Sequence, residues 1–315
     1  MKKILIFGGG TGISFLLRGL KDFPVEITSV ITVADNGSST GKLRKEFDMP
    51  AMGDIRKVLT NLSNIDKSVK DLMEYRFDTY TDLDGHPVGN LLLVSTYNMT
   101  GSLKKSIEVL RGVLNVKHKV FPLSEDNVTL KAKTVDGDII YGEESIGKEK
   151  REIRKLYYDK NIHIDKEVLD EIKMADLIIF SIGSLYTSII PNLLSKDIIK
   201  EIDKSKAKLL YTCNAVCQTC ETEGYKVSDH IKELNKYLGK RKIDSVIASN
   251  SKLPKDVLDK YLNEEMKKLV KIDKKEIEKY NCELIERDIL KIEDGLIRHD
   301  SLKLATEIFY YLMRD

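Results

Sequence analysis

The pattern of apolar and polar positions is sharpest at the start of the chain. An apolar run from Ile4 to Phe7 has the length of a buried strand, and five small residues, Gly8 to Gly12, follow it. Apolar side chains then recur with the spacing of one helix face, at Ile13, Leu16, Leu17 and Leu20. The pattern predicts a strand, a glycine turn and a helix, whose first N–H groups favour an anion such as phosphate. A tight turn without a ligand is the alternative.

Further apolar runs predict a layered α/β fold. Strands are expected at residues 27–33, 177–181, 208–212, 245–248 and 282–286, and helical patterns separate most of them. This alternation predicts a Rossmann-like, doubly wound and mostly parallel sheet of about six strands. Ligands bind beyond the carboxyl ends of such strands. We therefore expect the glycine turn, Asp35 and the loops that hold Ser184 and Asn214 to share one crevice.

Residues 115–150 change to a different pattern. Apolar and polar residues alternate from Val128 to Ala132, and Asp136-Gly137 has the composition of a hairpin turn. We expect an inserted helical segment and a β-hairpin insertion at 115–150 within a single α/β domain that spans residues 1–315. The charged segment 148–160 is expected to be a solvated linker or a helix surface.

Composition narrows the function classes. The 315 residues carry a net charge of +2 from 52 basic and 50 acidic side chains, a balance that gives no electrostatic footprint for nucleic acid. No apolar run approaches a membrane span, and the apolar stretch after Met1 is too short for a signal peptide. We expect a cytoplasmic protein with no nucleic-acid partner.

Asp35 and the small residues after it are candidates for ligand chemistry. A carboxylate after the second strand is where dinucleotide folds hold a ribose hydroxyl. Residues 36–44 form an expected loop whose hydroxyls and cations suit a phosphate, and a flexible solvated loop is the alternative. A Walker A loop is not matched, because three residues separate Gly37 from Gly41 and Leu43 follows the lysine.

Three further polar residues stand at the starts of predicted helices. Asp54 opens one helix, where it could serve as an N-cap. His86 and Asn90 precede the apolar helix at residues 91–99, and a structural hydrogen bond is the alternative to a catalytic role for His86.

Three cysteines lie in one loop, at positions 213, 217 and 220. Their spacing is the one that radical-SAM enzymes use for an iron–sulfur cluster. The loop follows a late strand, and Thr219 stands where an aromatic residue is usual. We therefore interpret Cys213, Cys217 and Cys220 as small residues of a ligand-binding loop and predict no cluster.

With all loops in view, the chain resembles the YvcK/CofD-like family of gluconeogenesis factors. The resemblance runs from Gly8 to His299 and rests on motifs in a fixed order. These are GGGTG (8–12), VADNGSSTGKLR (33–44), PAMGDIR (50–56), GHPVGNLLL (85–93), GSLYTSIIPNLL (183–194) and the loop 214–224.

The chain departs from the family pattern at several positions. Asn36 replaces an aspartate, and Ser38 replaces a glycine. In the loop that usually reads NVMTQPGET, Cys217, Thr219 and Cys220 replace Thr, Pro and Gly. A two-aspartate metal site would have one carboxylate fewer in this chain. The ligand loop, without Pro-Gly, is expected to have a different shape.

The resemblance implies a nucleotide-type ligand. One branch of the family, the 2-phospho-L-lactate transferases, moves a phospholactyl group onto a deazaflavin alcohol with Mg²⁺. The other, which this chain resembles more closely, binds UDP-sugars such as UDP-N-acetylglucosamine and affects cell shape and carbon metabolism. The candidate ligand-binding residues are Gly9, Gly10, Thr11, Gly12, Asp35, Ser38, Ser39, Lys42, Arg44, Asn90, Ser184, Thr187, Asn214, Gln218, Tyr261 and Arg298.

Two function hypotheses follow. The first is a UDP-sugar-binding regulatory protein, because several loops suit phosphate while no nucleophile–base pair is evident. The second is a magnesium-dependent phosphotransferase of the 2-phospho-L-lactate transferase type, in which Asp35 and Asp54 hold Mg²⁺ and His86 assists catalysis. A nicotinamide-dependent oxidoreductase is a third alternative, and the oligomeric state, a homo-oligomer included, stays open.

Overall fold

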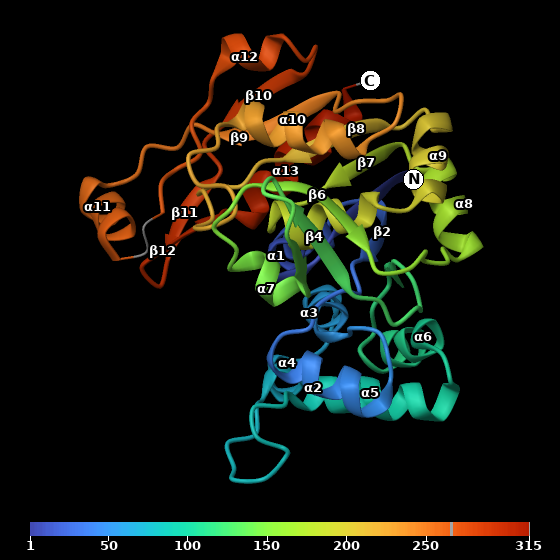
Figure 1. Ribbon diagram of the computed structural model, residues 1–315. Helices are drawn as coiled ribbons and strands as arrows, with labels where there is room; N and C mark the ends of the chain where they lie inside the picture. Colours follow the sequence, from blue (N-terminus) through green and yellow to red (C-terminus); the bar gives the residue numbers. More distant parts are fainter. Residues whose placement is uncertain (265–266, 315) are drawn as a thin grey trace.

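Seven parallel strands form the central sheet, in the order β10-β9-β8-β7-β1-β2-β3 (Figure 1). The computed structural model describes residues 1–264 and 267–314. The strands are β1 (Lys2–Gly8), β2 (Val25–Ile31), β3 (Lys119–Pro122), β7 (Leu177–Phe180), β8 (Lys208–Thr212), β9 (Ser245–Ser249) and β10 (Glu283–Arg287). The predicted Rossmann-like, mostly parallel sheet is confirmed. The additional strand is β3, which has only four residues and ends at a proline.

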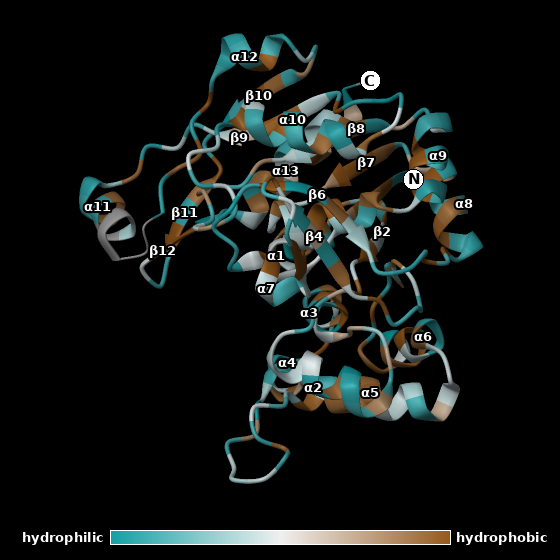
Figure 2. Cartoon of the chain, viewed as in Figure 1, coloured by the Kyte–Doolittle hydropathy of each residue, from teal (hydrophilic) through white to brown (hydrophobic). Residues whose placement is uncertain are grey.

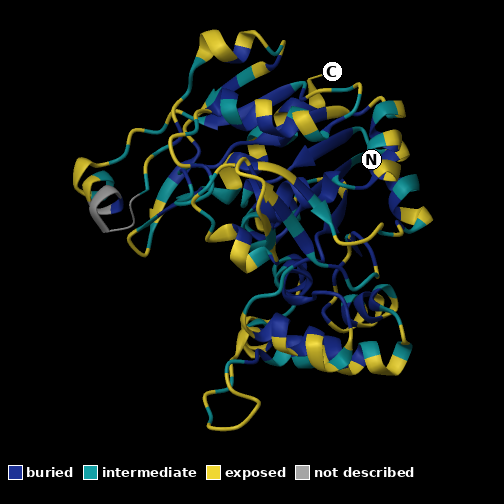
Figure 3. Cartoon of the chain, viewed as in Figure 1, coloured by how far each residue is buried: buried dark blue, intermediate teal, exposed yellow. Residues whose placement is uncertain are grey.

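Both faces of the sheet are covered, which explains the continuous apolar run of β1. Ile4 and Ile6 pack into the core on one face, whereas Leu5 and Phe7 pack into the core on the other. The first face carries helices α1 (Gly10–Leu20), α3 (Gly53–Leu62) and α13 (Ser301–Met313), and the second carries α8 (Lys166–Met174), α9 (Lys196–Lys204) and α10 (Val227–Tyr237). The sheet is accordingly hydrophobic in Figure 2 and buried in Figure 3.

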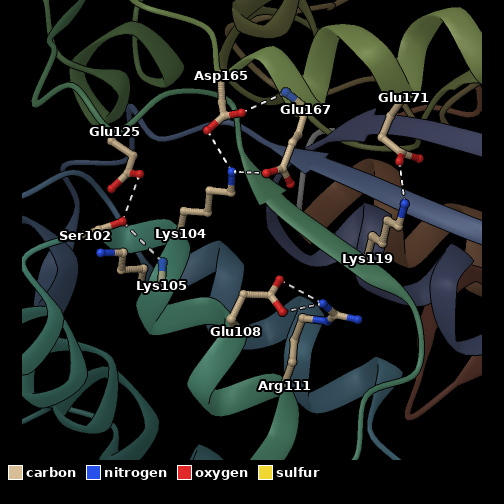
Figure 4. Close-up of polar contacts among 10 residues, drawn as sticks. All are labelled: Ser102, Lys104, Lys105, Glu108, Arg111, Lys119, Glu125, Asp165, Glu167 and Glu171. Carbon is tan, nitrogen blue, oxygen red and sulfur yellow. Dashed lines mark hydrogen bonds and ion pairs between the residues drawn. The ribbon is translucent and has the colours of Figure 1, made fainter.

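A helical layer lies against one end of the body, at the bottom of Figure 1. It consists of α2 (Ser38–Phe47), α4 (Lys67–Glu74), α5 (Val88–Thr100) and α6 (Leu103–Val113). Charged contacts tie α6 to the body (Figure 4). Lys104 Nζ lies 2.9 Å from Asp165 Oδ2 and 2.7 Å from Glu167 Oε1, next to the start of α8. Glu125 accepts a hydrogen bond from the N–H of Leu103 at 2.6 Å, which caps α6.

The prediction of a loop over residues 36–44 is wrong, because α2 begins at Ser38. Its small residues allow close packing rather than flexibility. A Cβ atom at Gly41 would lie 2.1 Å from the carbonyl oxygen of Asn36, and Ser39 and Thr40 are buried. Tertiary packing therefore outweighs the weak helix propensity of these residues.

A small antiparallel sheet, in the order β5-β4-β6, contains the expected hairpin. Strand β4 (Leu130–Thr134) pairs with β5 (Ile139–Tyr141) around the predicted turn, and β6 (Ile153–Tyr158) completes the sheet. The expected solvated linker at 148–160 is thus wrong over β6. A shift of register at Lys133/Thr134 accompanies the burial of both Ile153 and Leu156, which lie three residues apart on β6. The predicted insertion at 115–150 also differs in its bounds from the observed small sheet, because β3 belongs to the main sheet.

The last part of the chain returns to the carboxyl edge of the main sheet. It holds α11 (Lys255–Glu264), α12 (Lys274–Glu278) and the hairpin of β11 (Leu290–Glu293) with β12 (Leu296–His299), which leads into α13. Among the residues that the structure describes, no helix combines the length and apolar character required to cross a membrane.

Candidate functional site

A cavity of about 510 Å³ opens beyond the carboxyl ends of β1 and β7. These neighbouring strands mark the point where the strand order reverses, since β2 and β3 lie on one side of β1 and β7 to β10 on the other. Ligands of doubly wound folds bind at this position, and the volume lies within the rough 300–1,000 Å³ range of small-molecule sites. We call it the switch-point cavity.

The glycine turn forms one wall of the switch-point cavity. A Cβ atom at Gly12 would lie 2.2 Å from the carbonyl oxygen of Ile182, so only glycine lets α1 approach the loop after β7. The N–H of Gly10 donates to Asp54 Oδ2 at 2.5 Å. The N–H groups of Thr11 and Gly12 also lie in the first helical turn, which provides no backbone acceptor for them, and both residues line the cavity. The turn therefore offers anion-binding donors next to one that Asp54 already occupies.

The loop after β7 packs against the glycine turn and also lines the cavity. It leads into a single π-helical turn, η1 (Leu185–Ile189), and then a 3₁₀ turn, η2 (Ile190–Leu193). Asn214, from the loop after β8, clamps Gly183 through both backbone groups: Oδ1 accepts from its N–H at 3.1 Å and Nδ2 donates to its carbonyl at 2.7 Å. Glu221 Oε1 accepts from the Ser184 hydroxyl at 2.5 Å and from the N–H of Tyr186 at 2.7 Å.

A cationic group closes the cavity from the C-terminal hairpin. The guanidinium carbon of Arg298, on β12, lies 5.1 Å from the centroid of the Phe15 ring, and that of Arg18 lies 4.7 Å from the same centroid. Arg298 and Phe15 both line the cavity. The Phe15 ring thus holds the Arg298 guanidinium at the cavity that the glycine turn also lines, where it can contact a phosphate group.

Nine of the predicted ligand-binding residues line the switch-point cavity. They are Gly9, Gly10, Thr11, Gly12, Ser184, Thr187, Asn214, Gln218 and Arg298. They come from four separate segments of the chain. The sequence-based expectation that the glycine turn and the loops of Ser184 and Asn214 share one crevice agrees with this geometry.

Three other predicted residues contact one another outside the cavity, where α2 packs against the start of α5. The Ser39 hydroxyl lies 2.8 Å from His86 Nδ1 and 3.0 Å from Asn90 Nδ2, and Asn90 Oδ1 accepts from Arg56 Nε at 3.0 Å. All four residues are buried. Burial, followed by the positive charge of Lys42, lowers the pKa of His86. This arrangement favours the structural alternative for His86.

Four further predicted ligand residues lie outside the cavity lining. Arg44 is buried and donates to the carbonyl oxygens of Asp35 at 2.9 Å and Val128 at 2.6 Å. Tyr261 is buried beside β12, where its hydroxyl accepts from the N–H of Ile297 at 2.6 Å. Ser38 and Lys42 are exposed on α2. Arg44 and Tyr261 therefore hold the backbone together where the sequence suggested ligand contacts.

Residues 4–290 match the family described as 2-phospho-L-lactate transferase CofD. The chain belongs to the CofD family. It is 42% identical to the gluconeogenesis factor of Bacillus subtilis over 96% of each chain, and 38% identical to that of Listeria monocytogenes over 98% of this chain and 95% of the relative. A crystal structure of a Bacillus halodurans protein superposes with a TM-score of 0.94 at 38% identity, covering 98% of this chain and 99% of the other.

Asp35 and Asp54 are the residues that the phosphotransferase hypothesis assigns to Mg²⁺ in this CofD-family chain. Both lie outside the cavity lining, although Asp54 contacts the glycine turn directly behind it. Burial raises the pKa of Asp35, and the negative charge of Asp54 raises it further. Two carboxylates that repel one another fit a hard divalent cation, whose other ligands would be phosphate oxygens and water. Within residues 1–264 and 267–314, no group of three or more His, Cys, Asp or Glu side chains could hold a metal.

Sequence reasoning missed two carboxyl groups of the cavity, Glu143 and Glu221. Glu221 is retained in the family motif of the loop 214–224, and this could have identified it. Glu143 opens the short helix α7 (Glu143–Gly147), between β5 and β6, where no local pattern marks a ligand. It reaches the cavity because Asn36 Oδ1 accepts from the N–H of Glu144 at 2.9 Å and so holds α7 against the loop after β2.

The cysteine loop lies beside the cavity. Burial raises the pKa of Cys213 to about 12, and burial also raises the pKa of Cys217. A raised pKa favours the thiol over the thiolate that binds iron. Cys220 has a φ of 70°, at the position where the family usually has glycine. The absence of an iron–sulfur cluster stays a prediction, which an iron assay on anaerobically purified protein would test.

Proposed function

We propose that the chain binds a nucleotide diphosphate sugar of the UDP-N-acetylglucosamine type in the switch-point cavity and acts as a regulatory protein of central carbon metabolism and cell shape. The observation that supports this most is the composition of the cavity. It combines the first turn of α1, the glycine turn and Arg298 at the strand crossover. Helix N-termini and arginine are the groups that proteins use for diphosphates.

The remaining cavity residues suit the rest of such a ligand. Phe15 offers an aromatic ring for a sugar or a base, and Ser184 and Thr187 offer hydroxyl groups. Glu143 and Glu221 are oxygen-rich groups for sugar hydroxyls, the role that the sequence assigned to Asp35. Gln218 Oε1 is buried, and the described residues provide no hydrogen-bond partner for it. A ligand donor would satisfy this acceptor.

The relatives support the regulatory part of the proposal. Two bacterial proteins that match nearly the whole chain carry the name gluconeogenesis factor. The resemblance described above connects that branch with UDP-sugars and with cell shape. These relatives support the role in carbon metabolism, whereas the residues of the cavity support the class of ligand.

A magnesium-dependent phosphotransferase is the second candidate, and the Asp35–Asp54 pair favours it. Mg²⁺ bound there would neutralise phosphate oxygens during group transfer. Asp54 would act from behind the glycine turn, next to the phosphate-binding donors. His86 adds no support, because its Nδ1 contacts the buried Ser39 hydroxyl rather than the cavity.

A ligand panel tests both candidates. Thermal unfolding is measured with UDP-N-acetylglucosamine, UDP, GDP, NADPH and a deazaflavin, each with Mg²⁺ and with chelator. A ligand at 100 times its Kd stabilises the folded state by about 2.7 kcal/mol. We expect UDP-N-acetylglucosamine to raise the melting temperature in both buffers. No effect of any uridine nucleotide would contradict the proposal, and stabilisation only with Mg²⁺ together with product formation would favour the transferase.

A further inference from the structure

A short arm, residues 76–87, projects from the helical layer between α4 and α5 (Figure 1). A bridge between Arg76 and Pro87 closes its base, where the N–H of Gly85 also donates to the carbonyl of Phe77 at 2.8 Å. Arg76 Nη1 donates to the Gly85 carbonyl at 2.7 Å. These bonds fix the shape of the arm before it meets a partner, which lowers the entropy cost of binding. We call residues 76–87 the acidic arm.

The outer part of the acidic arm combines apolar and acidic side chains. Tyr80 is fully exposed, and Leu83 is 45% exposed. Asp78, Asp82 and Asp84 are exposed on the same segment, and Figure 3 shows the arm as mostly exposed. Because Tyr80 and Leu83 add nothing to the core of their own chain, burial against a partner is what would remove them from water.

A groove of about 510 Å³ lies beside α9, far from the acidic arm (Figure 1). Its apolar lining residues are Leu193, Leu194 and Ile199. Four exposed lysines line it as well, three of them spaced four residues apart along α9: Lys196, Lys200, Lys204 and Lys240. Asp203 also lines the groove, and its Oδ1 accepts from the N–H of Arg241 at 3.0 Å. We call it the lysine groove.

Two lysines of the groove lack an acidic partner. Lys204 pairs with Glu201 at 2.8 Å. Within residues 1–264 and 267–314, no ion pair involves Lys196 or Lys200. An acidic segment in the lysine groove would therefore form new ion pairs at the same time as its apolar side chains leave water.

The acidic arm has this composition, but it cannot reach the groove of its own chain. The arm lies at the bottom of Figure 1, whereas α9 lies at the upper right. The hydrogen bonds at the base of the arm hold it against the helical layer. A contact between the acidic arm and the lysine groove therefore requires a second copy of the chain.

We propose that two copies of this chain associate by placing the acidic arm of each in the lysine groove of the other. Tyr80 and Leu83 then cover the apolar residues of the groove, and the aspartates of the arm lie beside its lysines. Reciprocal exchange closes with two-fold symmetry, so each contact is made twice. The 12 residues of the arm and the 9 that line the groove give each copy an interface near the lower end of the roughly 20–30 residues per partner that stable complexes use.

Sedimentation velocity of the full chain over a range of concentrations measures this association. The wild type should form dimers that are weaker at high salt, because screening weakens the ion pairs of the arm. Tyr80→Ser should raise the dissociation constant about tenfold, whereas Tyr80→Phe keeps the ring and should preserve it. A wild type that stays monomeric up to about 100 μM, or a dimer that Tyr80→Ser leaves unchanged, would overturn the proposal.

Charge reversal tests whether the arm meets the groove. One variant reverses the arm, with Asp78→Lys and Asp82→Lys, and another reverses the groove, with Lys196→Glu and Lys200→Glu. Each variant alone should be monomeric, because like charges meet at both contacts. In an equimolar mixture opposite charges meet at both contacts, so mixed dimers should form with close to the wild-type affinity. The absence of mixed dimers, or wild-type dimerisation of either variant alone, would contradict the proposal.

Asp136→Lys is the matched control for these variants. It reverses an exposed charge on the turn between β4 and β5 and should dimerise as the wild type does. All of the reversed positions are exposed, so each variant should melt within a few degrees of the wild type. Loss of dimers in Asp136→Lys would show that net charge, rather than the arm and the groove, governs association.

Carbodiimide crosslinking, which joins carboxylates to amines in contact, provides a measurement that needs no variant. In a mixture of nitrogen-15-labelled and unlabelled wild type, it should link the aspartates of the arm in one copy to the groove lysines of the other. Dimers without these links would overturn the proposal. Intermolecular links from the groove lysines to any other acidic segment would also overturn it and would assign the groove to that segment.

Discussion

Asp54 caps the helix that follows the glycine turn, although it lies 44 residues from Gly10 in the sequence. Its Oδ2 accepts the N–H of Gly10 at 2.5 Å, while its Oδ1 lies 3.0 Å from Lys57 Nζ. A carboxylate at a helix N-terminus interacts favourably with the helix dipole. The contact ties α3 to the ligand-binding end of α1, so the shape of the anion site depends on a second helix.

Substitutions at Thr11 and Gly12 should affect different properties, the first ligand binding and the second the stability of the fold. Thr11 is exposed in the cavity, so Thr11→Trp should fill the phosphate position and abolish nucleotide binding while the melting temperature stays within a few degrees of wild type. Gly12→Ala should instead destabilise the fold by about 1–3 kcal/mol, because its methyl group would overlap the Ile182 carbonyl. Calorimetry and urea unfolding measure the two effects. Unchanged nucleotide affinity in Thr11→Trp would remove the turn from the site.

The two arginines assigned to ligand binding should behave differently. Arg298→Ala should weaken UDP-sugar binding about tenfold, or about 1.4 kcal/mol, with little effect on stability. Arg44→Ala should lower the free energy of unfolding by about 2–4 kcal/mol, because it leaves buried carbonyl groups such as that of Val128 without a donor. Binding titrations and urea unfolding of both variants test this contrast. The opposite ordering would make Arg298 structural.

Asp54→Asn separates a binding protein from a transferase. The amide oxygen can still accept from Gly10, but the charge that a hard cation and Lys57 require is lost. We expect a loss of about 1 kcal/mol in stability and a UDP-N-acetylglucosamine affinity that differs less than twofold between Mg²⁺ and chelator. Asp66→Asn, at an exposed position before α4, is the matched control. A strict Mg²⁺ requirement, with turnover that Asp54→Asn abolishes, would contradict the binding-protein proposal.

Buried histidines should make the protein sensitive to acid. Burial lowers the pKa of His230 and of His299 to about 4 in the folded state, whereas an unfolded histidine titrates near 6.5. The unfolded chain therefore binds more protons between these values, and stability should fall as the pH drops from about 6.5 towards 4, by up to about 3 kcal/mol for each histidine. Urea unfolding across this range measures the slope.

His299→Gln isolates one of these contributions. Glutamine can still donate to the Cys213 carbonyl, which His299 Nε2 contacts at 3.1 Å. The variant should unfold with a flatter pH dependence than wild type. His163→Gln alters an exposed histidine and should leave the slope unchanged. Equal slopes for wild type and His299→Gln would show that His299 does not titrate as this structure indicates.

Most strands of the central sheet could be predicted from the sequence, because the hydrophobic patterns of strands and helices are local. The apolar run before the glycine turn predicted β1, and the predicted strand at 208–212 has the bounds of β8. Alternation of strands and helices makes neighbouring strands parallel, and the carboxyl ends of parallel strands lie at the same edge of the sheet. From this rule alone the sequence brought Thr11, Ser184 and Asn214 to one cavity.

Tertiary structure decided which polar side chains face that cavity. Arg44 and Tyr261 carry groups suited to a ligand, but backbone groups from distant segments occupy them. Glu143 reaches the cavity only because Asn36 holds α7 in place, and Asp54 caps a helix other than its own. A side chain's chemistry is visible in the sequence, whereas its hydrogen-bond partner is the group that folding places within about 3 Å, and long-range packing sets that distance.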